Sequence, residues 1–109
     1  METLAESLTL VGRDIGRALA ALEGDGGASP VLRAVLVELE KKSRKAEAAL
    51  PTADERGARE LVVELEQAGD SAKAAVLADT GAAENTRKLV VLAHDSICIL
   101  KQQSGTKSA

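Results

Sequence analysis

The chain has 109 residues, a formal net charge of −3 and no Phe, Tyr or Trp, although 45% of it is apolar. Aromatic side chains commonly stack on bases, sugars and cofactor rings, so their absence argues against these ligands, and no cofactor or small-molecule substrate is expected. The acidic balance, with a pI near 5.2, argues against a general nucleic-acid binder, because such a protein needs an excess of Lys and Arg facing the phosphates.

Length and apolar content predict one folded domain over residues 1–103, followed by a disordered polar tail over residues 104–109. The single cysteine, Cys98, has no second cysteine with which to form an internal disulfide. The first residues lack the pattern of a secretory signal, and no stretch approaches the roughly 20 apolar residues of a membrane span. We therefore expect a soluble protein of the cytoplasm, with the nucleus as the alternative.

Two helices are predicted in the first half of the chain. One covers about residues 3–23 and opens with a capping box of Thr3 and Glu6. The next begins at Ser29, a good N-cap residue, and is stopped by Pro51. Apolar residues recur in steps of three and four, which predicts one buried stripe on each helix. The stripes are Leu4, Leu8, Val11, Ile15, Ala18 and Leu22, then Leu32, Val35, Leu36, Leu39, Ser43, Ala46 and Leu50.

A third helix is predicted to open with a second capping box, formed by Thr52 and Glu55. Gly69 is a weak point within it, but the apolar stripe stays in phase across that position, which favours a continuous helix. The stripe consists of Ala58, Leu61, Leu65, Ala68, Ala72, Ala75 and Val76.

The fourth predicted helix runs from Ala82 to about Gln103, with a stripe of Val90, Ala93, Ile97 and Leu100. Residues 89–100 also allow a short β-hairpin, because two β-branched runs flank polar residues there. We favour the helix, since a lone two-stranded hairpin is poorly stable and no other segment offers a strand.

Four helices of similar length joined by short loops predict an all-α fold, an up-down-up-down four-helix bundle. The step pattern of the stripes is typical of coiled-coil-like packing. The alternative is a three-helix bundle in which the third helix is broken and repacked at Gly69.

His94 is the one histidine, and Cys98 lies one turn further along the same helix, so a Cys–His pair is geometrically feasible. We interpret the pair as ordinary packing and assign no catalytic residue. A histidine on a helical bundle also raises phosphotransfer, but Asp95 would repel a phosphohistidine, and Ile97 stands where histidine phosphotransfer domains carry a lysine. A phosphotransfer-like or small catalytic bundle centred on His94 is therefore the alternative hypothesis.

His94 and Cys98 would supply only two of the four ligands that structural zinc requires, so no metal site is predicted. The segment Lys41, Lys42, Ser43, Arg44 and Lys45 concentrates four cations near the end of the second helix. There they offset the helix dipole and solvate the outer face. The functional alternative is a basic patch for an acidic partner or an anionic membrane.

The fourth helix is apolar almost all round, which distinguishes it from the other three. At about 100° per residue, Val91 and Cys98 fall on one flank of its stripe, and Leu92 and Ile99 fall on the other. Because no helix of a four-helix bundle is central, these four residues predict an interface with a protein partner or in a homodimer. The leading hypothesis is a non-enzymatic interaction module, an adaptor or complex subunit that self-associates or binds a partner helix.

Overall fold

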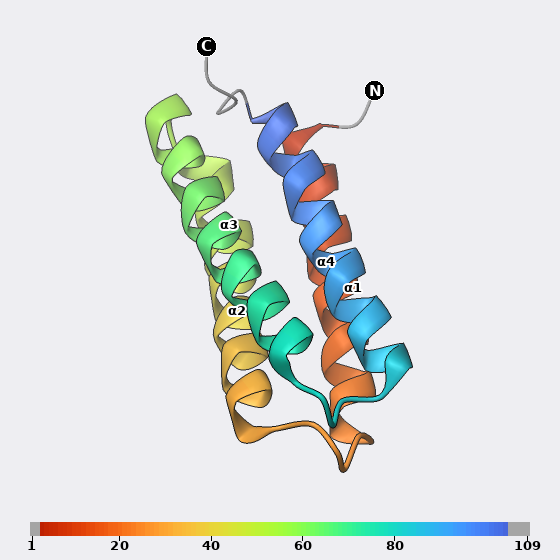
Figure 1. The fold of residues 1–109 in the computed structure, drawn as a ribbon. Coiled ribbons are helices and arrows are strands. Elements are labelled where there is room, and N and C mark those ends of the chain that lie inside the picture. The colour runs from red at the N-terminus through yellow and green to blue at the C-terminus, as the bar shows by residue number, and fades with distance from the viewer. Residues whose placement is uncertain (1–2, 105–109) are drawn as a thin grey trace.

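The computed structural model describes residues 3–104 and contains four long helices (Figure 1). They are α1 (Leu4–Glu23), α2 (Pro30–Ala49), α3 (Glu55–Ala78) and α4 (Glu84–Gln103), with a short 3-10 turn, η1 (Leu50–Thr52), after α2. The described residues contain no strand. The predicted all-α four-helix bundle is therefore confirmed.

Both alternatives to this reading of the sequence are wrong. α3 is continuous through Gly69, so the chain is not a three-helix bundle with a broken third helix. Residues 89–100 lie inside α4 and do not form a hairpin. At 24 residues α3 is the longest helix, and its buried stripe explains why one glycine does not break it.

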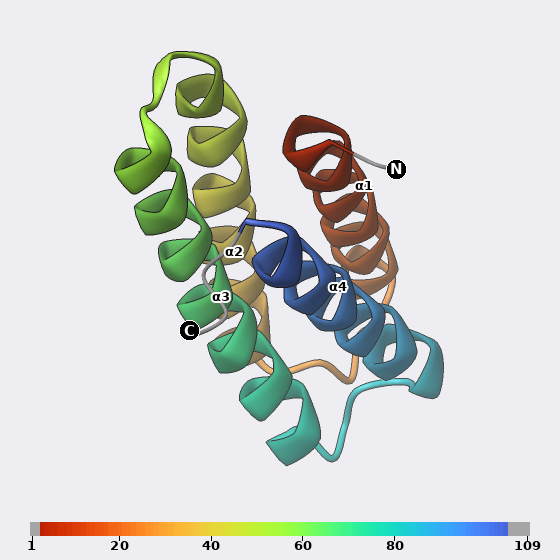
Figure 2. The ribbon, with the colours of Figure 1, turned by 90° about the horizontal axis from the view of Figure 1, so that it is seen from above.

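The helices associate as two pairs, with α1 beside α4 and α2 beside α3 (Figures 1 and 2). The α1–α2 and α3–α4 loops lie at one end of the bundle, and the α2–α3 connection lies at the other end, together with the described ends of the chain. Aliphatic side chains from all four helices fill the space between the pairs. The fully buried large residues include Val11, Ile15, Leu22, Leu32, Leu36, Leu39, Leu65, Val76, Val90, Ile97 and Leu100.

The helix starts follow the predicted capping chemistry with one correction. Thr3 and Glu6 form the capping box of α1, and the Ser29 hydroxyl accepts the Leu32 N–H at the start of α2. The predicted box of Thr52 and Glu55 is wrong. Thr52 belongs to the 3-10 turn that contains Pro51, and Asp54 caps α3 instead by accepting the Gly57 N–H at 2.7 Å.

The buried stripe of α3 is rotated slightly from the predicted one. Leu65, Ala72 and Val76 are buried as expected, whereas Leu61, Ala68 and Ala75 are only partly buried. Val62 and Gly69 take the inner positions. At Gly69 the absence of a side chain admits Ile97 of α4, whose Cδ1 would lie 2.8 Å from an added Cβ.

Two aspartates tie the two interhelical loops to each other. The Asp25 carboxylate, after α1, accepts the Ala83 N–H at 2.7 Å and the Thr86 hydroxyl at 2.8 Å, at the start of α4. The Asp79 carboxylate, after α3, accepts the Ser29 N–H at 2.8 Å, at the start of α2. Each loop therefore caps the helix that follows the other loop.

The two sets of contacts are equivalent, because the residues of one set lie a constant number of positions away from those of the other set along the chain. Asp25 and Asp79 are 54 residues apart, and so are Gly27 and Gly81. The same spacing relates buried residues of α1 to α3 and of α2 to α4: Leu8 to Val62, Val11 to Leu65, Ala18 to Ala72, Leu22 to Val76, Leu36 to Val90, Leu39 to Ala93 and Ala46 to Leu100. The bundle thus consists of two equivalent helical hairpins, α1–α2 and α3–α4. Their reciprocal contacts are those expected of two hairpins related by an approximate two-fold axis.

Ser104, the first residue of the predicted polar tail, is the C-cap of α4. Ser104 closes α4, because its N–H donates to the Leu100 carbonyl at 3.0 Å. The rest of that tail, residues 105–109, lies outside the described residues.

Candidate functional site

The apolar character of α4 is largely explained by its position between α1 and α3. One face of α4 is buried in the core through Val90, Ala93, Ile97 and Leu100. Leu89 and Val91, beside that face, are partly buried and pack against the core. The buried surface of α4 is therefore wider than a single stripe. Fewer of its apolar residues are left for a partner than the sequence indicated.

The four residues predicted as an interface do not form one continuous face. Leu92 and Ile99 are 43% and 53% exposed, while Val91 and Cys98 are half-buried. Leu92 and Ile99 are seven residues apart and so point in nearly the same direction. Cys98 lies on the opposite flank, beside His94 and α3.

The side of α4 that carries Ile99 meets α1, and Leu92 lies in a depression formed by α4 residues. Ile99 and Leu10 line a small depression between the two helices, together with Ser7 and Ser96. We call Leu10, Leu92 and Ile99 the α1–α4 strip. Leu10 was not assigned to an interface from the sequence, because only the antiparallel packing of α1 and α4 brings it beside Ile99.

Polar contacts beneath the α1–α4 strip hold α1 and α4 together. The Ser96 hydroxyl donates to the buried Asp14 carboxylate, and the Ser7 hydroxyl donates to the Gln103 side chain. These bonds fix the register of the two helices and thereby the spacing of the exposed aliphatic residues above them.

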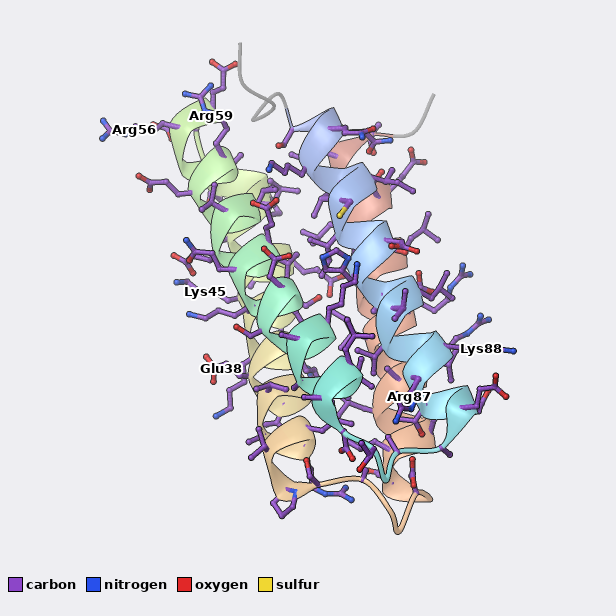
Figure 3. The ribbon with its side chains drawn as sticks, viewed as in Figure 1. Glu38, Lys45, Arg56, Arg59, Arg87 and Lys88 are labelled. Atoms are coloured by element: carbon purple, nitrogen blue, oxygen red, sulfur yellow. The ribbon has the colours of Figure 1, made fainter. Side chains whose placement is uncertain are left out.

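Most of the basic cluster on α2 is neutralised by glutamates. Lys42 and Lys45 lie 3.7 and 3.0 Å from the Glu64 carboxylate of α3, and Lys42 also lies 3.9 Å from Glu38. Arg44 lies 3.3 Å from Glu40. Figure 3 shows Lys45 on the outer edge of the α2–α3 pair.

The hydrogen bond from Lys45 holds the pKa of the Glu64 carboxyl below its ordinary value, and the charge of Lys42 lowers it further. The remaining cation of the cluster, Lys41, lines a shallow depression along α2 with Val37 and Glu38. The cluster thus joins α2 to α3 electrostatically and presents little uncompensated positive charge.

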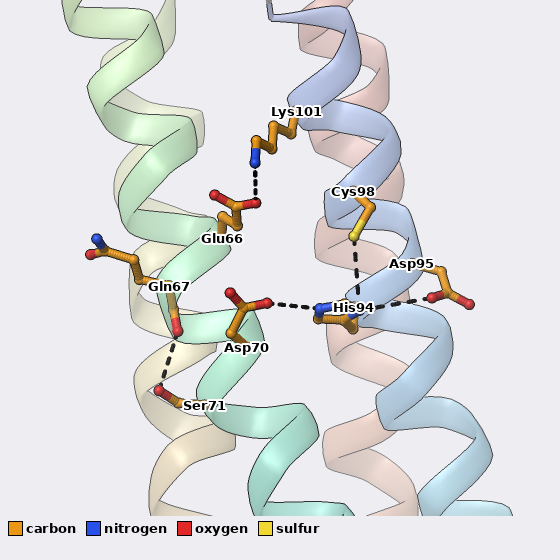
Figure 4. A network of polar contacts seen from close by, with 8 residues as sticks. All are labelled: Glu66, Gln67, Asp70, Ser71, His94, Asp95, Cys98 and Lys101. Carbon is orange, nitrogen blue, oxygen red and sulfur yellow. Dashed lines mark hydrogen bonds and ion pairs between the residues drawn. The ribbon is translucent and has the colours of Figure 1, made fainter. Parts of the chain in front are cut away.

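His94 stands in a polar network between α3 and α4 (Figure 4). Its Nε2 lies 2.8 Å from the Asp70 carboxylate, and its Nδ1 lies 3.9 Å from the Cys98 sulfur. Because a carboxylate only accepts, the Asp70 contact places a proton on Nε2, so in neutral His94 the Nδ1 atom accepts from the thiol. Lys101 and Glu66 form a neighbouring ion pair at 2.7 Å.

Asp70, His94 and Cys98 follow one another in the same order as the orienting acid, the base and the nucleophile of a thiol enzyme. The charges around Cys98, however, disfavour a thiolate. Burial raises the pKa of the Cys98 thiol, and the carboxylates of Asp95, Asp70 and Glu66 raise it further. A nucleophilic cysteine needs the opposite shift. Asp70 was not singled out from the sequence, because it lies 24 residues from His94 and only the packing of α3 on α4 joins them.

Within residues 3–104, no group of three or more His, Cys, Asp or Glu side chains is arranged to hold a metal ion. In the same part of the chain, no helix combines the length and the apolar character that crossing a membrane requires. Comparison of the chain with models of known families, with curated proteins and with solved structures gives no match.

Proposed function

We propose that the protein is a soluble, cytoplasmic, non-enzymatic interaction module, an adaptor or complex subunit that self-associates or receives a partner helix along α4. The observation that carries the proposal is the exposure of two large aliphatic side chains, Leu92 and Ile99, on one side of α4. Ile99 lies beside Leu10 of α1, and Leu92, seven residues earlier on α4, lines a depression with Val91 and Lys88. Apolar residues at a seven-residue spacing are what a partner helix recognises.

The charge pattern around the α1–α4 strip also supports a protein partner. Arg13, Arg17 and Lys88 are exposed, and within residues 3–104 none of them lies in an ion pair. Lys88 points outward from α4, on the edge of the molecule opposite Lys45 (Figure 3). A rim of charged residues around an aliphatic centre is the usual composition of a transient interface.

The test charges the α1–α4 strip in the double variant L92E/I99E. Burying each aliphatic side chain against a partner contributes about 1.5–3 kcal/mol, so losing both weakens association by more than about a hundredfold. Light scattering should give a mass above the 11.3 kDa of one chain for the wild type and that of one chain for the double variant. If the wild type is monomeric, the two proteins are compared as bait in a pull-down from the native lysate.

The matched control is V31E/L77E, because Val31 and Leu77 are 66% and 61% exposed but lie on α2 and α3. This control should associate like the wild type, and circular dichroism should show the same helicity for all three proteins. Equal mass and equal capture for wild type and L92E/I99E would contradict the proposal.

The Asp70–His94 hydrogen bond favours a second candidate function, a small catalytic or phosphotransfer bundle centred on His94. One observation argues against phosphotransfer. The His94 Nε2 atom, which points from α4 toward α3, is already hydrogen-bonded to the Asp70 carboxylate. The variant H94A separates the two functions. It should leave association unchanged if the protein is an interaction module, and it should abolish activity if His94 is catalytic.

A further inference from the structure

The two halves of the bundle differ at one pair of equivalent positions. Between α3 and α4, Glu66 and Lys101 form a cross-helix ion pair at 2.7 Å. The residues 54 positions earlier, between α1 and α2, are Gly12 and Glu47. On this side of the bundle, glycine takes the place of the acid and a glutamate takes the place of the lysine.

As a result, the Glu47 carboxylate has no lysine opposite it at the position equivalent to that of the Glu66–Lys101 pair. An added Cβ on Gly12 would lie 3.2 Å from Glu47 Oε1, so the carboxylate rests directly over the glycine. Among the described residues, Glu47 lies in no ion pair and accepts no hydrogen bond from a side chain. Within residues 3–104, the negative charge of Glu47 at this helix pair is therefore not compensated.

A second polar group beneath Glu47 also lacks a partner. Ser43 lies one turn before Glu47 on α2, is 2% exposed, and its hydroxyl makes no hydrogen bond. The same added Cβ on Gly12 would lie 3.5 Å from this hydroxyl. Buried hydroxyls are normally paired, so this side of the helix pair is less completely satisfied than the rest of the core.

Glu47 borders a cleft of about 360 Å³ between the start of α1 and the end of α2. This volume is within the range of pockets that bind small molecules. Among residues 3–104, Glu47 is the one charged side chain of the lining, and the other lining residues described are Ala5, Leu8, Thr9, Leu50 and Pro51. The cleft thus combines a mostly apolar wall with one anion at its edge.

We propose that this cleft binds a small organic cation, a protonated amine that carries a short hydrocarbon chain. The ammonium group pairs with the Glu47 carboxylate and takes the role that Lys101 has toward Glu66 in the other half. The hydrocarbon chain lies along Ala5, Leu8 and Leu50. The site is separate from the α1–α4 strip and does not depend on the proposed function.

The test titrates the 15N-labelled protein with n-hexylammonium, 1-hexanol and hexanoate, which share one chain length and differ in charge. We expect the amide signals of Ala5, Thr9 and Leu50 to shift with the lowest dissociation constant for hexylammonium and the highest for hexanoate. E47Q should raise the dissociation constant for hexylammonium by up to about fivefold, since an exposed charge pair contributes up to about 1 kcal/mol. The same variant should leave binding of hexanol unchanged.

Two further variants separate the charge from the cleft. A5L should weaken both hexylammonium and hexanol, because the larger side chain fills the apolar wall and Ala5 is exposed enough to be replaced without disturbing the core. E60Q, which removes an exposed carboxylate on α3, should change nothing. The proposal is overturned if no cleft signal shifts with hexylammonium, if the three ligands bind equally, or if E47Q binds hexylammonium as the wild type does.

Discussion

Gly27 and Gly81 face each other at the end of the bundle where the two loops meet. A Cβ on Gly27 would lie 2.1 Å from the Gly81 carbonyl oxygen, and a Cβ on Gly81 would lie 2.3 Å from the Gly27 carbonyl oxygen. Both neighbours are backbone atoms, so no side chain can rotate away to make room. Gly and Asp, which are typical turn residues, stand in both loops. The contact between the loops follows from no local pattern, because it joins segments 54 residues apart.

We expect G27A and G81A each to destabilise the protein by about 1–3 kcal/mol, the usual range for overpacking a closed contact. Urea denaturation followed by circular dichroism measures the change. G26A is the control, because nothing lies within 4 Å of a Cβ at that position. A destabilisation by G26A as large as that of G27A would show that loop flexibility, rather than the contact, is responsible.

Equivalent helices of the two halves tolerate glycine for different reasons. Gly16 of α1 is exposed and has nothing within 4 Å of an added Cβ, whereas Gly69 of α3 is buried against Ile97 of α4. A sequence pattern treats both as helix-weakening residues. The structure shows that only Gly69 serves the packing of two helices.

G16A should therefore raise the free energy of unfolding by about 0.5–1 kcal/mol, because alanine favours the helix and meets no obstacle. G69A should lower it by about 1 kcal/mol, since overpacking against the buried Ile97 side chain outweighs the gain in helix propensity. Thermal and urea unfolding measure both changes.

The double variant G69A/I97V checks the cause at this contact. Valine lacks the Cδ1 atom that lies 2.8 Å from the added Cβ, so the double variant should be more stable than the sum of the single changes implies. Strict additivity would mean that Ile97 is not what the alanine methyl group meets.

At the whole-molecule scale, Asp25 and Asp79 join the two helical hairpins at the end of the bundle where the α1–α2 and α3–α4 loops lie. The hydrogen bond from the Ala83 N–H lowers the pKa of the Asp25 carboxyl from its ordinary value of 3.8, and the Thr86 hydroxyl lowers it further. The hydrogen bond from the Ser29 N–H lowers the pKa of the Asp79 carboxyl in the same way. Both carboxylates bind across the interface between the two hairpins, so their protonation acts on the association of the halves.

A carboxyl whose pKa is lower in the folded state stabilises the fold above its ordinary pKa. The contribution is lost as pH falls through the folded-state value, because the unfolded chain binds the proton first. We expect the contribution of the two carboxylates to be constant above about pH 5 and to fall steadily below 3.8. Urea unfolding of the wild type and of D25N/D79N, measured at a series of pH values from above about 5 to below 3.8, tests this expectation.

The double variant D25N/D79N should be less stable near neutral pH and should lose less stability on acidification. Glu64, whose pKa is also lowered, leaves a residual slope that E64Q removes. If D25N/D79N and the wild type lose stability equally on acidification, the Asp25 and Asp79 carboxylates do not cause the loss.

The sequence by itself determined the helices, most of their buried stripes and the all-α class. These depend on local physics: apolar residues at a spacing of three and four, the Thr3 and Ser29 caps, and Pro51. It also marked Leu92 and Ile99 as residues without an internal role, and the structure leaves both exposed.

Only the tertiary structure decided what depends on contacts between distant segments. It divided the predicted interface by placing the Cys98 flank of α4 toward α3 and Ile99 beside Leu10 of α1. It also paired the basic cluster with Glu64, and it placed Asp25 at the start of α4 and Asp79 at the start of α2. The physical reason is that helix periodicity specifies which face of a helix is buried, but the neighbour of each flank is set by how four helices share one core.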